Sequence, residues 1–133
     1  MSPVGARGEE EKRKPERASL GRRGERVARE YLERLGYRIV AVDFRLGHHQ
    51  ADLLAWEGGR PVVVEVKSAW GDFRPEVNFR PSQAKRLLLL GTRFFSSFFK
   101  NRTVPVRLDL VTVHFSPSSP PQVRVFRDLR VLP

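Results

Sequence analysis

The stretch GRPVVVEVKSAW, residues 59–70, holds the most strongly β-forming run of this 133-residue chain. Its valines, at positions 62–64 and 66, have the branched side chains that strands favour. Glu65 and Lys67 interrupt the run two residues apart. Because side chains along a strand alternate between its two faces, this acid and this base share one face, while Val64 and Val66 share the other. The stretch predicts a buried strand with a charged pair on one side.

The two glycines that precede this strand predict a tight hairpin. Residues 51–57 form another strand-like run, and Gly58-Gly59 is typical of a two-residue turn between antiparallel strands. Counting outward from the turn places Asp52 opposite Glu65 and Gln50 opposite Lys67. These four side chains should form one patch, in which two opposed carboxylates are destabilising unless something offsets their charge.

A divalent cation would offset that charge. Carboxylate oxygens are the ligands that Mg²⁺ prefers, and it commonly completes its shell with water and a substrate phosphate. Lys67 could then orient or deprotonate an attacking water, or stabilise charge on the phosphate. The patch predicts phosphodiester hydrolysis with Mg²⁺ or Mn²⁺. The structural alternative is that Lys67 only neutralises Asp52 and Glu65 in a salt-bridge network.

The remaining pattern predicts an α/β protein with the element order α-β-β-β-α-β. Apolar and small residues recur at helical spacing over residues 20–35, and Ser19 is positioned as the helix cap. A strand is expected over 37–44, a second helix over 82–99 after Pro81, a strand over 106–113 and a short edge strand over 122–126. Residues 1–18 are charged and poor in apolar side chains, so we expect a disordered arm followed by a single domain, 19–133.

Composition favours a polyanionic partner. Lys and Arg total 25 against 15 Asp and Glu, for a net charge of +10. The chain has no cysteine, which excludes disulfides and thiolate metal sites. No apolar run approaches the roughly 20 residues of a membrane span, so we expect a cytoplasmic protein with no membrane partner.

An ordered set of motifs carries a family resemblance. The motifs are Gly21-Arg22-Arg23-Gly24-Glu25, Tyr31-Leu32, Gly36-Tyr37, Arg45, Asp52-Leu53-Leu54, Val63-Val64-Glu65-Val66-Lys67 and Arg107-Leu108-Asp109. Together they resemble the YraN-like family of bacterial proteins, which is grouped with the PD-(D/E)xK nucleases and the archaeal Holliday-junction resolvases. The resemblance implies a restriction-endonuclease-like fold, in which helices flank a central mixed sheet.

The resemblance also implies roles for individual residues. Asp52, Glu65 and the backbone carbonyl of Val66 would hold the metal, and Lys67 would serve the nucleophilic water. Glu25 would be the helix-borne acid of related resolvases, available to a second metal or to the water. Gln83, at the start of the second helix, would support the site.

We expect DNA as the partner, in the form of a branched or single-stranded substrate. The sequence does not distinguish DNA from RNA. The expected nucleic-acid-binding residues are Arg22, Arg26, Arg45, Lys85 and Arg86.

Gln50 stands where the family usually has glutamate, which leaves an alternative: a non-catalytic nucleic-acid-binding or adaptor protein with a degenerate nuclease site. A purely structural or protein-binding domain is a third interpretation. The four phenylalanines between positions 94 and 99 exceed one helical stripe, which leaves a homodimer open.

Overall fold

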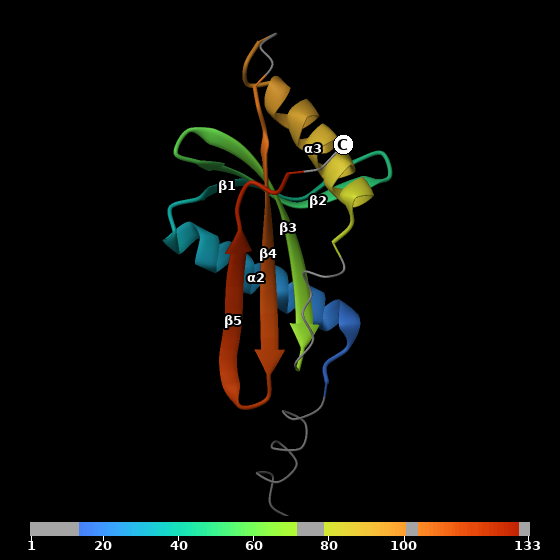
Figure 1. Ribbon diagram of the computed structural model, residues 1–133, viewed down its shortest axis with the longest axis vertical. Helices are drawn as coiled ribbons and strands as arrows, with labels where there is room; N and C mark the ends of the chain where they lie inside the picture. The colour runs from blue at the N-terminus through green and yellow to red at the C-terminus, as the bar shows by residue number, and fades with distance from the viewer. Residues whose placement is uncertain (1–13, 72–78, 101–103, 131–133) are drawn as a thin grey trace, which may run out of the picture.

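The computed structural model describes residues 14–71, 79–100 and 104–130. The helices and strands of these residues are α2 (Arg17–Arg34), β1 (Arg38–Leu46), β2 (His49–Glu57), β3 (Arg60–Trp70), α3 (Pro81–Ser96), β4 (Arg107–Ser116) and β5 (Ser119–Phe126). In this part of the chain the strands form one sheet in the order β1-β2-β3-β4-β5 (Figure 1). Only β3 and β4 run parallel, and α3 makes the crossover between them. The predicted element order and mixed sheet are confirmed, and they form a restriction-endonuclease-like core.

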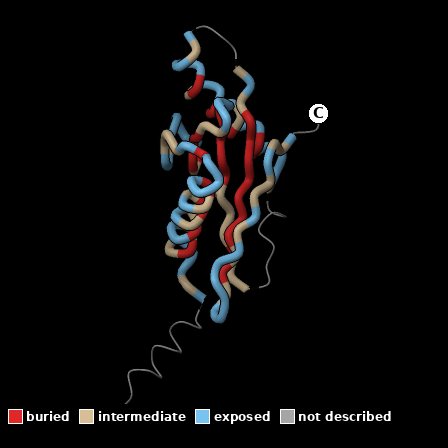
Figure 2. Tube along the Cα trace, turned by 90° about the vertical axis from the view of Figure 1, so that its left-hand side faces the viewer, coloured by how far each residue is buried: buried red, intermediate tan, exposed pale blue. Residues whose placement is uncertain are grey.

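The two helices pack against opposite faces of the sheet. On one face, Ala28 and Leu32 of α2 join Val64 in a buried cluster. On the other face, Leu87 of α3 joins Val63. Neighbouring valines of β3 therefore point to different helices, as the alternation of side chains along a strand requires. Buried residues run along the middle of the sheet, while the outer turns of the helices are exposed (Figure 2).

The start of the first helix differs from the prediction. Ser19 is not the cap, because α2 begins at Arg17 and Glu16 occupies the cap position. The Leu20 N–H donates to the Glu16 carbonyl at 2.9 Å, which extends the helix backwards through residues of good helix propensity. The predicted disordered arm lies outside the described residues from 1 to 13, and its last two residues belong to α2.

The aromatic residues at the end of α3 contribute mainly to the core. Phe95 is 1% exposed and packs edge-on against Trp56 of β2, and Phe94 packs against Phe44 of β1. Phe98 is 56% exposed at the margin of this cluster. Across the described ranges, neither helix is both long and apolar enough to cross a membrane.

Candidate active site

Strands β2 and β3 stop pairing beside the two central carboxylates. Their register runs from Glu57 opposite Arg60 to Leu53 opposite Val64, which confirms the predicted pairing over this length. Past Leu53, β2 stays paired with β1, and β3 continues beside β4 as far as Trp70 (Figure 1). Asp52 and Glu65 are the first residues beyond the last β2–β3 pair. They lie at a fork in the sheet.

Asp52 bridges this fork. Its Oδ2 accepts a hydrogen bond of 2.7 Å from the Val66 backbone N–H, so a side chain takes the place of a strand carbonyl. The pKa of Asp52 is raised to about 8, first because burial disfavours the charged form and then because Glu65 interacts with it. The Val66 N–H acts in the opposite direction and stabilises the carboxylate.

The start of α3 reaches the second carboxylate. Pro81 occupies the first turn of α3, and Gln83 follows two residues later in a half-buried position. The Gln83 Nε2 donates to Glu65 Oε2 at 3.3 Å. The structure thus brings together Gln83 and Glu65, two of the predicted site residues that lie 18 positions apart in the sequence.

A second group of carboxylates approaches Asp52 from α2 and β1. Glu25, Asp43 and Asp52 each place a carboxylate oxygen within 4.8 Å of the others. Burial raises the pKa of Glu25 to about 7, and the charges of Asp52 and Asp43 add to the effect. Glu25, which sequence periodicity alone would leave as a solvated helix charge, points to the site.

Asp43 is a site residue that the sequence analysis missed. It lies between Val42 and Phe44, whose partners on β2 are Leu53 and Ala51, and so it faces Asp52. The sequence did contain a signal that could have placed Asp43 opposite Asp52. Treating Gly47-His48 as a two-residue turn and counting outward gives this register. Asp43 also has a φ of 52°, in the left-handed region that non-glycine residues rarely adopt.

The predicted contact between Gln50 and Lys67 is wrong. Because β2 leaves β3 after Leu53, Gln50 pairs with Arg45 across the β1–β2 hairpin, and its Nε2 donates to Asp43 Oδ1 at 3.2 Å. Lys67 lies opposite Thr112 of β4. Its side chain forms no ion pair with any acid in residues 14–71, 79–100 or 104–130, so the described structure lacks the salt-bridge network of the alternative interpretation.

Among the residues that the structure describes, two pockets flank the fork, and basic side chains line both. The pocket beside α3 has a volume of about 140 Å³, and its lining residues are His48, His49, Gln50, Glu65, Gln83, Arg86, Leu87 and Leu90. The pocket beside α2 has a volume of about 280 Å³, and its lining residues are Arg22, Glu25, Arg26, Arg29, Val42, Asp43 and Leu53. Of the predicted nucleic-acid-binding residues, Arg22, Arg26 and Arg86 lie in these pockets. Arg45 and Lys85 are exposed nearby on β1 and α3.

A close contact between α2 and β3 holds Glu25 at the site. Gly24 is buried against Ser68, and a Cβ placed on Gly24 would lie only 1.7 Å from Ser68 Oγ and 2.9 Å from Ser68 Cβ. Only glycine lets the helix backbone come this near the strand. The neighbouring Glu25 is thereby brought within reach of Asp52.

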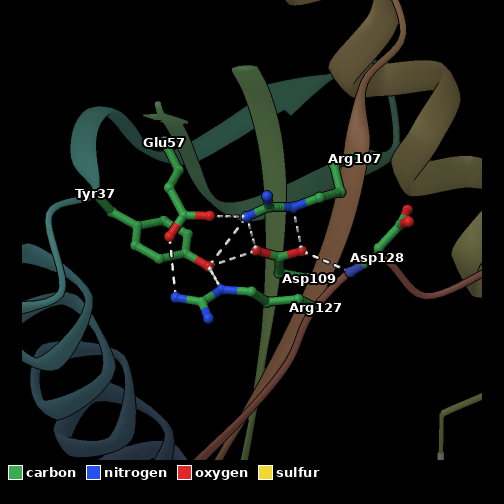
Figure 3. Close-up of polar contacts among 6 residues, drawn as sticks. All are labelled: Tyr37, Glu57, Arg107, Asp109, Arg127 and Asp128. Carbon is green, nitrogen blue, oxygen red and sulfur yellow. Dashed lines mark hydrogen bonds and ion pairs between the residues drawn. The ribbon is translucent and has the colours of Figure 1, made fainter. Parts of the chain in front are cut away.

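A buried polar network ties the start of β4 to Tyr37, to the end of β2 and to the segment after β5 (Figure 3). Asp109 is fully buried, and its carboxylate accepts hydrogen bonds from Arg107, from the Tyr37 hydroxyl at 2.7 Å and from the Asp128 backbone N–H. Arg107 also bonds to Glu57 at the β2–β3 turn, at 2.6 Å. The Gly36-Tyr37 and Arg107-Leu108-Asp109 motifs therefore have a structural role.

Together, the mixed sheet covered by helices and the carboxylates at its fork define an α/β protein of the restriction-endonuclease-like class. Residues 24–113 match the family described as Uncharacterised protein family UPF0102, and the chain belongs to this family, also called YraN. It is 31% identical to the UPF0102 protein of Thermodesulfovibrio yellowstonii, over 74% of this chain and 88% of that protein. It is 34% identical to the UPF0102 protein of Clavibacter michiganensis subsp. michiganensis, over 81% and 92% respectively.

Proposed function

We propose that this protein is a nuclease that hydrolyses phosphodiester bonds with a divalent cation, Mg²⁺ or Mn²⁺. The observation that carries the proposal is the arrangement at the fork. Asp52 and Glu65 meet where β2 and β3 part, and Lys67 follows two residues later on β3 without an acidic partner in the described residues. Two carboxylates with a nearby unpaired ammonium suit the binding and activation of a phosphodiester.

The donor set fits a hard divalent cation. Asp52 and Glu65 offer oxygen ligands, and the Val66 carbonyl follows Glu65 on the same strand. Their crowding disfavours full ionisation, as the raised pKa of Asp52 indicates, and a cation would relieve that cost. A bound cation would lower the pKa of water and stabilise charge on the phosphate.

The other residues have roles that their positions support. Lys67 would orient or deprotonate the attacking water, or neutralise charge on the phosphate. Gln83 holds Glu65 in place through its 3.3 Å hydrogen bond. Glu25 and Asp43 supply further carboxylates beside Asp52, available to a second cation or to the water.

Nucleic acid is the proposed substrate, because basic side chains border the fork on two sides. Arg22 and Arg26 line the pocket beside α2, and Arg86 lines the one beside α3. Arg45 and Lys85 would extend this basic surface along the phosphate backbone. Such contacts supply affinity that is independent of sequence and falls as salt rises.

A second candidate is a nucleic-acid-binding protein without catalysis. The observation that favours it is the hydrogen bond from Gln50 to Asp43, in which a neutral amide occupies a position where the resemblance leads one to expect an acid. The site then carries one negative charge fewer to hold a cation.

Cleavage of labelled substrates distinguishes these candidates. Duplex, single-stranded, flap and four-way-junction DNA, and single-stranded RNA, would be incubated with Mg²⁺, Mn²⁺ or EDTA. For a nuclease, we expect metal-dependent cutting that falls by about 100-fold or more in Asp52→Asn and Lys67→Ala. Lys14→Ala and Glu33→Gln, at exposed positions outside the site, are matched controls that should keep activity. Salt-sensitive binding without cutting by the wild type would refute the nuclease and support the second candidate.

A further inference from the structure

Three arginines of α2 form a stripe along one side of the candidate active site. Arg22, Arg26 and Arg29 are four and three residues apart, which places them on one face of the helix. All three line the pocket of about 280 Å³ that also contains Glu25 and Asp43. A row of guanidinium groups therefore borders two of the site carboxylates.

These arginines are not used to neutralise the neighbouring acids. In the described part of the chain, residues 14–71, 79–100 and 104–130, none of the three guanidinium groups forms an ion pair or a hydrogen bond. Other arginines of the same helix do have partners, since Arg23 stacks over Phe115 and Arg34 over Tyr31. The stripe keeps its hydrogen-bond donors free for an anion, and guanidinium suits phosphate because its planar fork can donate two parallel bonds.

The pocket also has an apolar wall. Val42 is 42% exposed beside it, and Leu53 lies at its base. A phosphate alone gains nothing from such a wall, whereas the sugar and base of a nucleotide do. In a duplex the faces of the bases are stacked inside, so a pocket on the protein surface meets phosphates, sugars and base edges but no base face. An unpaired nucleotide can present both its phosphate and its base.

We infer that the pocket beside α2 binds an unpaired nucleotide next to the bond to be cut, with its phosphate on Arg22, Arg26 and Arg29 and its base against Val42. The inference rests on the proposed function, and it adds that the preferred substrate has a single-stranded segment. The nucleic-acid strand would then pass from this pocket to the carboxylates at the fork.

Binding in EDTA tests the inference without requiring catalysis. Fluorescence anisotropy would compare one blunt DNA duplex with the same duplex carrying a single-stranded extension, for wild type, Arg26→Ala, Arg29→Ala and Val42→Ser. Arg93→Ala, at an exposed position of α3 that lines neither pocket, is the matched control for loss of one arginine. Circular dichroism would verify that each variant is folded.

The wild type should bind the extended duplex more tightly than the blunt one. Arg26→Ala and Arg29→Ala should lose about tenfold in affinity for the extended duplex and at most a few-fold for the blunt one. Val42→Ser should lose affinity for the extended duplex alone. Arg93→Ala should affect both probes equally. Equal losses on both probes in Arg26→Ala would overturn the inference in favour of a simple phosphate contact, and no loss on either would exclude the pocket. If the wild type binds with this preference but never cuts with Mg²⁺ or Mn²⁺, the proposed nuclease fails while the subsite stands.

Discussion

The Val66 backbone N–H donates a hydrogen bond of 2.7 Å to Oδ2 of Asp52, 14 residues earlier in the chain. This bond joins the two strands at the point where their regular pairing ends at Leu53 and Val64. It holds a carboxylate between the two arms of the sheet, beside Glu65, where burial and Glu65 raise the pKa of Asp52 although the bond itself acts to lower it.

Without a divalent cation, stability should fall as pH rises. Asp52 has a pKa of about 8 in the folded protein and Glu25 one of about 7, whereas ordinary values in an unfolded chain are about 4. The folded state therefore binds more protons than the unfolded state between about pH 4 and pH 8, and the free energy of unfolding decreases through this range. Asp52→Asn should reduce the slope of the free energy of unfolding against pH. This variant should be more stable than wild type at pH 8, by about 1 to 3 kcal/mol. Urea unfolding in EDTA at several pH values measures this, and parallel curves for the two proteins would contradict it.

Adding Mn²⁺ or Mg²⁺ at pH 8 should stabilise the wild type. A ligand that binds only the folded state adds about 2.7 kcal/mol at a concentration 100 times its Kd, which corresponds to an increase of several degrees in Tm. Asp52→Asn should lose most of this increase, because it removes the carboxylate that interacts with both Glu65 and Glu25. The measurement is thermal unfolding with MnCl₂ or MgCl₂, with NaCl at equal ionic strength as the control. An equal rise in Tm for both proteins would place cation binding elsewhere.

Gly24→Ala should destabilise the protein by about 1 to 3 kcal/mol, because its methyl group would collide with Ser68. Gly21→Ala is a matched control in the same helix, since nothing lies within 4 Å of a Cβ there. That control should instead stabilise α2 by up to about 1 kcal/mol. Adding Ser68→Ala to Gly24→Ala should recover part of the loss. Chemical denaturation of the wild type and these three variants measures the effects, and similar effects of the two single glycine substitutions would refute the close-contact explanation.

Tyr37→Phe should cost about 1 to 3 kcal/mol, because it removes a donor to the fully buried Asp109 carboxylate. The same hydroxyl accepts hydrogen bonds from Arg107 and Arg127, at 3.1 and 3.0 Å. Tyr31→Phe is the matched control in α2, where the ring lies under Arg34 and no side-chain hydrogen bond of the hydroxyl occurs within the described residues. The control should change stability by less than about 0.5 kcal/mol. Equal effects of the two substitutions on urea unfolding would contradict a stabilising role of the hydrogen bond between Tyr37 and Asp109.

Local signals in the sequence were sufficient for most of the fold. The apolar spacing of residues 20–35 and the valines of residues 62–66 depend on near neighbours, so they predict a helix and a strand without knowledge of the rest. Gly58-Gly59 fixed the β2–β3 register, because a two-residue turn leaves a single antiparallel pairing. Ser19 misled the prediction, since a capping residue one turn further in does not prevent the helix from starting earlier.

The composition of the site depended on contacts that no local pattern encodes. The sequence by itself determined that Asp52 and Glu65 end up at the same place, since short-range turn geometry sets their strands. Only the tertiary structure brought Glu25 and Asp43 to Asp52 and moved Gln50 away from Lys67. The physical reason is that these outcomes depend on how closely α2 packs on β3 at Gly24 and on where the sheet divides. Both follow from the packing of the whole chain.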